Sequence, residues 1–486
     1  MSLPRSTPEE QGLSSAAVAR FVEALRSEAP GVHSVMLVRH GHVVAEGWFA
    51  PYRRSHPHSM FSVSKSFVAT AVGFAIEDGL VGLDDAVVDL LPDDLPAVVG
   101  DNLAAMRLRH LLTMTSGHAV DTVEALAEHE HNWAKTILAQ PVTLAPGSTF
   151  VYNSGATYLI SAILQSVTGL RVLDYLTPRL LEPLGIESAT WEQCPRGIDA
   201  GGWGLSITTD DLAAFGQTYL DGGRWAGEQV VPAHWVSEAT RLQVENGDDG
   251  TRGDDGQGYG YQFWRNRHGT YRADGAFGQK AVVFPDHDTL LVMTAGLPEA
   301  QVALDAVWEH LLPVLGTGAP LRPDATAARA LHDLLAGLTL PLPLGAPSSP
   351  VGDRVRGTVY RLPRNALGLE SVALDVAPDA TTLTLVTAAG PQAVVCGVGR
   401  WVDGRAVLLG PEAGGRPAGE PVSAAGAWAD DDSFVATVHY TTTPFALTVS
   451  LDFAASRPGV AEVTVNVEQN AAFGPTQLLH TNGRAI

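Results

Sequence analysis

Strand-like runs at two distant places in the sequence constrain the fold most. The first, SVMLVRHGHVVAEGWF (34–49), predicts two strands joined by a turn at His40-Gly41-His42. Comparable patterns return only after residue 257, in GYGYQFWR, GTYRADG, QKAVVFPD and TLLVMTAG. Between them, residues from about 80 to 225 carry mostly helical patterns. This order predicts an α/β (α+β) domain whose antiparallel sheet is assembled from distant segments around a helical insert.

A second change of pattern divides the chain near residues 340–350. A helical run, DATAARALHDLLAGL, is followed by the proline-rich stretch TLPLPLGAPSSP. Beyond it the sequence is β-rich, with runs such as TTLTLVT and FALTVSLDF separated by turn residues. We therefore expect a first domain at 1–320, a helix and linker at 321–350, and an antiparallel β domain at 351–486. That last domain is either a sandwich or a small barrel.

Composition excludes several classes of function. The 486 residues are 45% hydrophobic and 17% charged, which is typical of a folded globular protein. A formal net charge of −22 repels phosphate, so we expect no nucleic acid and no membrane among the partners. The two cysteines, Cys194 and Cys396, indicate no disulfide framework, and MSLPRSTPEEQG lacks the features of a secretory signal. These observations favour a soluble cytoplasmic protein and leave a homo-oligomer open.

Lysine is rare in this chain, and one lysine stands in a notable place. Only Lys65, Lys135 and Lys280 occur among 31 basic residues. Lys65 begins an apolar run and lies three positions after Ser62, in Ser62-Val63-Ser64-Lys65. On a helix this spacing brings the hydroxyl and the amine to one face, where the amine can take the serine proton. The alternative interpretation is a surface N-cap serine beside an exposed lysine.

Two further segments are candidates for the same site. Tyr152 lies in PGSTFVYNSGATYLISAIL, on a predicted loop before a helix, where a phenol beside an ammonium is able to shuttle a proton. Ordinary aromatic packing is the alternative for this tyrosine. The other segment, Ala273-Asp274-Gly275-Ala276-Phe277-Gly278-Gln279, lies between strand patterns, and its glycines allow close approach of a ligand. By itself it also suits a simple turn.

In order and setting, these three elements resemble the serine β-lactamase-like superfamily, in particular its class C β-lactamase and penicillin-binding-protein-like esterase branch. That family carries Ser-x-x-Lys, then Tyr-x-Asn, then Lys-Thr-Gly or His-x-Gly on a strand. The resemblance covers about residues 5–315 and includes RHLLTMTSGH and GGWGLSITTDDLAAFGQTYLDGG. It implies Ser62 as acylated nucleophile and Lys65 and Tyr152 as the proton-transfer pair. It also implies an oxyanion hole made by the backbone N–H groups of Ser62 and Ala276.

This sequence departs from the family pattern in two places. Ser154 stands where the family has asparagine, and Ala273-Asp274-Gly275 fills the Lys-Thr-Gly slot without a cation for a substrate carboxylate. The Gly-Ala-Phe-Gly-Gln form is instead similar to that of the nylon-oligomer (6-aminohexanoate-dimer) hydrolases and related esterases. We therefore expect a serine hydrolase acting on a small-molecule ester or amide. The residues expected to line its substrate site are Ser154, Asp274, Gly275, Gln279 and Trp203.

Other functions are weaker alternatives. A non-catalytic binding or regulatory protein that kept the fold is one, and a D-amino acid peptidase or weak β-lactamase is another. The histidine pairs His40/His42, His56/His58 and His129/His131 lack a metal-binding spacing, so we expect neither a metal nor a cofactor. The aromatic residues Tyr259, Tyr261, Phe263 and Trp264 suit either a substrate cleft or core packing.

Overall fold

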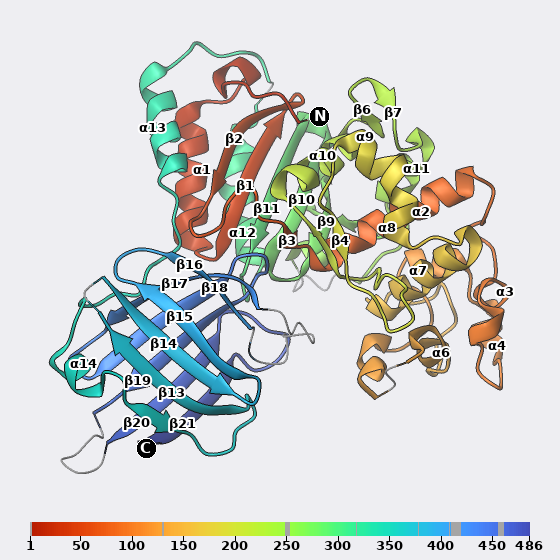
Figure 1. Ribbon diagram of the computed structural model, residues 1–486. Helices are drawn as coiled ribbons and strands as arrows, with labels where there is room; N and C mark the ends of the chain where they lie inside the picture. Colours follow the sequence, from red (N-terminus) through yellow and green to blue (C-terminus); the bar gives the residue numbers. More distant parts are fainter. Residues whose placement is uncertain are drawn as a thin grey trace.

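A computed structural model describes residues 2–128, 131–247, 253–316, 318–377, 379–407, 409, 419–454 and 461–486. Figure 1 shows two bodies joined side by side: a sheet with helices on both of its faces, and a β structure built from the second part of the chain. The chain crosses from the first body to the second after helix α13 (Ala325–Ala336).

The first body contains a six-stranded antiparallel sheet in the order β2-β1-β11-β10-β9-β8. Its strands are β1 (Val32–Arg39), β2 (His42–Trp48), β8 (Trp264–Arg265), β9 (Tyr271–Gly275), β10 (Gln279–Phe284) and β11 (Thr289–Ala295). The hairpin near the N-terminus thus pairs with strands some 250 residues away, as the sequence predicted. One strand prediction was too long. In GYGYQFWR only the last two residues are a strand, because Gly258 (φ 94°) and Gln262 (φ 62°) leave the extended conformation.

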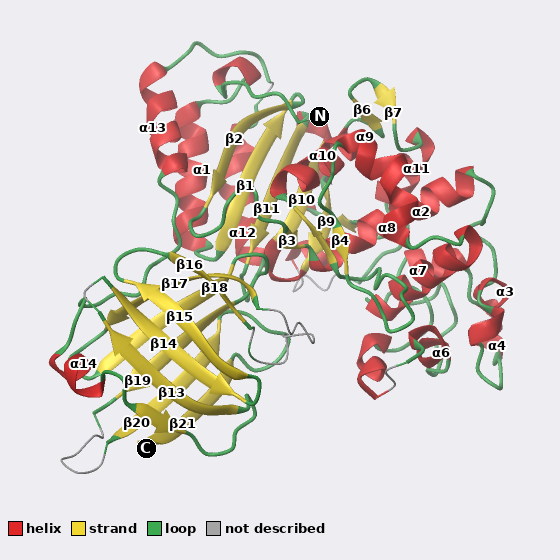
Figure 2. Ribbon diagram, in the orientation of Figure 1, coloured by secondary structure: helices red, strands yellow, loops and turns green. Residues whose placement is uncertain are grey.

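Both faces of this sheet are covered by helices (Figure 2). Successive residues of β1 alternate between two cores: Val35 and Leu37 belong to one, and Met36 and Val38 to the other. The helices over the first face are α1 (Ser15–Glu28), α12 (Gln301–Ala306) and α13. The second face meets the helical insert, in which α10 (Thr209–Leu220) packs on β10 and β11.

The insert is mostly helical, as the sequence predicted. Its further helices are α2 (Ser64–Glu77), α3 (Val87–Leu90), α4 (Asp101–Ala105), α5 (Leu108–Leu112), α6 (Trp133–Leu138), α7 (Ser154–Thr168), α8 (Val172–Leu176), α9 (Glu182–Leu184) and α11 (Ala233–Thr240). Residues Thr122–Glu128 form the 3-10 helix η4 rather than an α-helix. Among the described helices none alone has the length and apolarity to cross a membrane, although the bent pair Ser154–Thr168 and Val172–Leu184 passes that test by length and composition.

The second body is a ten-stranded antiparallel sheet in the order β15-β14-β13-β12-β21-β20-β19-β18-β17-β16. Its strands are β12 (Val359–Arg361), β13 (Leu369–Val376), β14 (Ala380–Thr387), β15 (Gly390–Gly397), β16 (Val402–Ala406), β17 (Glu420–Trp428), β18 (Ser433–Tyr440), β19 (Ala446–Asp452), β20 (Glu462–Gln469) and β21 (Gln477–Ala485). A further pairing of β15 with β17 through Gly397 and Ala425 closes the sheet. Of the two predicted architectures, the barrel is therefore correct.

The stretch between the two bodies carries contacts to both. Helix α13 packs against α1 and β2, whereas α14 (Pro350–Val355) places Val351 and Val355 in the barrel core. Ala346 already pairs with Trp428 of the barrel. The division of the chain at 321–350 stays a prediction.

The turn between β18 and β19 docks the barrel onto the first body. The backbone N–H of Ser59 donates to the carbonyl of Thr442 (2.9 Å), and the Tyr52 hydroxyl donates to that of Thr443 (3.1 Å). The side-chain amide of Asn470 donates to the carbonyl of Gly296 (2.8 Å). Because Ser59 lies three residues before Ser62, the barrel reaches the segment that carries the candidate nucleophile.

Candidate active site

Ser62 and Lys65 lie at the entry to helix α2. Ser62 belongs to the 3-10 turn η2 (Phe61–Val63), and α2 itself begins at Ser64. The Ser64 hydroxyl donates to the carbonyl of Phe61 (2.6 Å) and accepts from the N–H of Leu205 (3.1 Å), which fixes the turn. Lys65 Nζ stands 2.9 Å from Ser62 Oγ. The predicted contact between hydroxyl and amine is therefore present.

The Lys65 amine is buried among polar atoms. Its side chain is 1% exposed, and Nζ also donates to the Ser154 hydroxyl (3.2 Å) and to the carbonyl of Gly202 (2.7 Å). Burial lowers the pKa of Lys65 to about 7, against a smaller opposite effect of the Asp121 carboxylate. An amine with such a pKa is available as a base near neutral pH, unlike an exposed lysine.

Tyr152 faces the same amine. The Lys65 ammonium lies 4.8 Å from the centre of the Tyr152 ring, which is stacked on Trp264 at 5.3 Å. Burial raises the pKa of the Tyr152 phenol far above its usual value, although a hydrogen bond with Ser62 lowers it in part. Desolvation therefore favours the protonated phenol in the resting site, beside an amine whose pKa is lowered.

Ser154 is brought to Lys65 by the start of α7. Asp121 Oδ1 accepts from the backbone N–H groups of Ser154 (2.9 Å) and Gly155 (3.4 Å), and so stabilises this helix end. Asn153 is fully buried and accepts from Ala156 and from Thr122. Sequence analysis missed Asp121, because a single aspartate before a distant short helix carries no recognisable pattern.

The Gly201-Gly202-Trp203 segment closes the site over Lys65. A Cβ on Gly202 would stand 2.7 Å from the carbonyl oxygen of Ser154, so only glycine allows this approach. The Trp203 side chain stacks on Trp133 at 5.7 Å, while its carbonyl accepts from Trp191. The predicted substrate residue Trp203 thus borders the site next to Gly202, and its ring packs against the insert.

Strand β9 brings Gly275 and Ala276 to the nucleophile turn. A Cβ on Gly275 would meet the carbonyl oxygen of Met60 at 2.3 Å, so the two backbones touch just before Ser62. Ala276 begins the short turn η8 (Ala276–Gly278). Gln279 is fully buried, and its amide donates to the carbonyls of Ala276 (2.9 Å) and Ala295 (2.8 Å). It supports the turn from behind and is not presented to a substrate.

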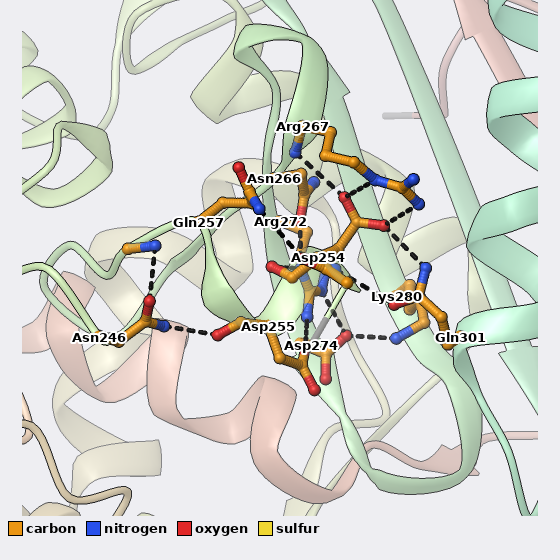
Figure 3. A network of polar contacts seen from close by, with 12 residues as sticks. Asn246, Asp254, Asp255, Gln257, Asn266, Arg267, Arg272, Asp274, Lys280 and Gln301 are labelled. Carbon is orange, nitrogen blue, oxygen red and sulfur yellow. Dashed lines mark hydrogen bonds and ion pairs between the residues drawn. The ribbon is translucent and has the colours of Figure 1, made fainter. Parts of the chain in front are cut away.

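Asp274 is tied into a network of charged side chains, drawn in Figure 3. Arg272 Nε donates to Asp274 Oδ1 at 2.7 Å, and Lys280 forms an ion pair with the same oxygen. Arg272 also pairs with Asp255. Burial raises the pKa of Asp274, but Lys280 and Arg272 outweigh it and the pKa is lowered. Two cations thus lie beside this slot, but both are engaged by carboxylates of the protein.

The remaining candidates separate into core and periphery. Three of the aromatic residues considered for a substrate cleft pack in the core instead, because they are at most 3% exposed: Tyr259, Tyr261 and Phe263. Trp264 is partly exposed and stacks on Tyr152.

The predicted histidine pairs are not part of a metal site among the residues that the structure describes. Within the described part of the chain, no group of three or more His, Cys, Asp or Glu side chains is arranged to hold a metal ion. His129 of the third predicted pair lies outside the described residues.

A family model described as Beta-lactamase matches residues 18–312. The 6-aminohexanoate-dimer hydrolase of Paenarthrobacter ureafaciens is 27% identical over 294 residues, which cover 56% of this chain and 75% of that enzyme.

Two solved structures share the fold. A putative 6-aminohexanoate-dimer hydrolase from Bacillus anthracis is 20% identical, with a TM-score of 0.51, and covers 63% of this chain and 85% of its own. The structure of SurE has the same identity and TM-score but covers 97% of this chain and 98% of its own. The barrel is therefore part of a two-body arrangement that occurs elsewhere.

Proposed function

The chain belongs to the β-lactamase family, and from that premise we propose that it is a serine hydrolase that cleaves a small-molecule ester or amide through an acyl-enzyme. One observation carries the proposal: a buried amine, with its pKa lowered to about 7, stands 2.9 Å from the Ser62 hydroxyl. A buried lysine without an ion-pair partner destabilises a fold, so its position beside a serine supports a chemical task.

Acylation uses three side chains. Ser62 Oγ attacks the carbonyl carbon, its proton passes to neutral Lys65 Nζ, and the carbonyl π electrons move to oxygen. The N–H groups of Ser62 and Ala276 stabilise that oxyanion. When the intermediate collapses, the protonated Tyr152 phenol gives its proton to the departing alcohol or amine and regains one from the Lys65 ammonium. Water then attacks the acyl carbon while its proton passes to neutral Lys65, and the bond from that carbon to Ser62 Oγ breaks as Oγ takes a proton from the Lys65 ammonium, which releases the acid.

The segment 273–279, which carries Asp274, favours a substrate without a carboxylate near the scissile bond. Arg272 and Lys280 are both paired with Asp274, and Arg272 is also paired with Asp255. No uncompensated cation in this network is offered to an anion. This arrangement supports an esterase or amidase over a β-lactamase or a peptidase that grips a peptide C-terminus. The similarity to a 6-aminohexanoate-dimer hydrolase supports an amide among the substrates.

The test combines labelling and turnover. Wild-type protein is treated with an alkyl fluorophosphonate and, separately, with p-nitrophenyl esters. We expect one phosphonyl group on Ser62, ester turnover, and loss of both in Ser62→Ala with unchanged circular dichroism. Normal labelling of Ser62→Ala would overturn the assignment. Absence of labelling and of turnover across esters, amides and D-amino acid peptides would favour the non-catalytic binding protein.

A further inference from the structure

Four phenylalanine rings from the two bodies meet beside the candidate oxyanion hole. Phe61 and Phe277 are packed edge to face at 5.3 Å. Phe445 contacts both rings, at 6.0 Å and 5.5 Å, and Phe473 contacts them at 6.1 Å and 4.9 Å. We call these four residues the aromatic wall. It joins the catalytic body to the barrel through side chains, in addition to the backbone contacts of the β18–β19 turn.

Two members of the aromatic wall are sequence neighbours of the proposed oxyanion residues. Phe61 precedes Ser62, and Phe277 follows Ala276. Both have a positive φ, 47° for Phe61 and 64° for Phe277, which is unfavourable for a residue with a bulky side chain. Such conformations persist only where packing enforces them. The position of both backbone N–H groups therefore depends on how these two rings are held.

The barrel holds the two rings from behind. Phe445 is 4% exposed, and Phe277 belongs to the barrel's hydrophobic core while Phe61 and Ala276 pack against that core. The turn that carries Phe445 is fixed by a hydrogen bond of 3.1 Å from the Phe445 N–H to the Thr443 hydroxyl. Phe445 thus has no access to a substrate, and its contacts act through Phe61 and Phe277.

Phe473 differs from the other three in its exposure. It lies in the connection between β20 and β21, one side of its ring rests on Phe277 and Phe61, and 72% of the residue is exposed. Exposure of a large aromatic group costs hydrophobic stabilisation, and the place where it occurs adjoins the nucleophile turn. An apolar group of a bound substrate would cover this surface.

We propose that Phe473 forms the apolar wall of the acyl site and selects substrates with an extended apolar group next to the scissile carbonyl, while Phe445 is a positioning residue behind Phe61 and Phe277. This inference rests on the proposed hydrolase function. It assigns a role in catalysis to the barrel, which lies wholly outside the matched residues 18–312.

The first experiment compares Phe473→Ala with wild type on p-nitrophenyl acetate and p-nitrophenyl octanoate. The expected kcat/KM falls about tenfold for octanoate and less than twofold for acetate, because only the long chain reaches the wall. Leu344→Ala is the matched control, since Leu344 is 89% exposed and lies in the linker. An equal effect on both esters, or none on octanoate, would overturn the role of Phe473.

A second variant, Phe445→Leu, tests the positioning role. The expected result is a lower kcat on both esters with little change in KM, because misplaced oxyanion donors weaken the transition state and not the ground state. An unchanged kcat, or a rise in KM alone, would overturn it.

Phosphonate inactivation separates this inference from the proposed function. Ser62 is allowed to react with a short and a long alkyl phosphonate in wild type and in Phe473→Ala. If both reagents react, and the ratio of their rates is the same in the two proteins, the role of Phe473 is refuted while the hydrolase proposal stands. If Ser62 reacts with neither phosphonates nor esters, the hydrolase proposal itself fails, and so does the proposed role of Phe473 that rests on it.

Discussion

Lys65 Nζ donates a hydrogen bond of 2.7 Å to the carbonyl oxygen of Gly202, and this contact sets the orientation of the amine. A carbonyl only accepts, so one N–H is always directed at Gly202. A neutral amine has two N–H bonds and one lone pair. With the second N–H directed at Ser154, the lone pair is left to accept the Ser62 proton.

The activity of the protein should therefore follow the titration of Lys65. We expect kcat/KM for an ester to rise with pH through an apparent pKa of about 7, because only the neutral amine accepts a proton. Lys65→Arg should lose at least about a hundredfold in kcat, since guanidinium stays protonated. Lys135→Arg, at an exposed lysine, is the control. A pH-independent rate in wild type would contradict the assignment of Lys65 as the base.

Lys65 should also reduce the stability of the fold. Its pKa is about 7 in the folded protein against 10.5 for an exposed lysine, so between these pH values the unfolded chain binds more protons. The penalty is therefore complete below pH 7 and disappears as the pH rises toward 10.5. Lys65→Met should raise the free energy of unfolding by roughly 1–4 kcal/mol at pH 7, as replacement of buried charges often does. Urea denaturation at pH 7 and pH 10 should show this gain shrinking.

Neutralising Asp274 should change the charge preference of the site. Asp274 and Lys280 are direct cross-strand partners, and Asp274→Asn leaves Lys280 and Arg272 with a surplus positive charge. We expect kcat/KM for 4-nitrophenyl hemisuccinate, relative to the neutral butyrate, to rise about tenfold, or about 1.4 kcal/mol. The double variant Asp274→Asn/Lys280→Met should restore the wild-type ratio. An unchanged ratio in the single variant would show that substrates do not sense this network.

Acid should loosen the junction between the two bodies. His33, His58 and His439 are buried there; His33 Nδ1 lies 3.1 Å from His58 Nε2, and the rings of His33 and His439 are 6.3 Å apart. Burial lowers the pKa of His58 to about 4 and that of His439 to about 3. The unfolded chain thus takes up protons first, and stability falls as the pH drops below 6.5, by up to about 2 kcal/mol per histidine at pH 5.

Urea midpoints at pH 7.5 and pH 5 would measure this effect. His439→Gln should narrow the difference between the two midpoints, whereas His480→Gln, at an exposed histidine of β21, should leave it unchanged. Equal narrowing by both variants would contradict the role of the junction.

Adding a methyl group at Gly275 should disturb its contact with the turn that carries Ser62. A Cβ at 2.3 Å from the Met60 oxygen forces the two backbones apart, so Gly275→Ala should lower kcat about a hundredfold by displacing Ser62. Gly100→Ala is the control, because nothing lies within 4 Å of its Cβ and its φ is ordinary. Wild-type kcat in Gly275→Ala would mean that the turn tolerates the shift.

Local spacing made part of this site predictable. Ser62 and Lys65 are three residues apart, and Tyr152 precedes a strong helical pattern, so short-range geometry carries the signal. Asp121 and Gly202 escaped prediction because they act through backbone groups of remote segments. The partners of Asp274 depend on strand register, which the sequence of β9 and β10 does not reveal on its own.

The barrel shows the same limit on a larger scale. Its alternating strands were recognisable, whereas its closure depends on a single pairing between β15 and β17. Phe445 and Phe473 occur in loops without a pattern, and only the folded chain brings them to Phe61 and Phe277.

Three hydrogen bonds that dock the barrel end on the main-chain carbonyls of Gly296, Thr442 and Thr443, and the Arg53–Asp403 ion pair adds a contact between side chains. Main-chain carbonyls survive most amino-acid replacements, so the side chains of Thr442 and Thr443 can change without removing these two acceptors. Gly296 is the exception, because a Cβ there would stand 2.1 Å from the Pro444 oxygen. Proteins that descend from this one with both bodies docked should therefore keep a glycine at position 296.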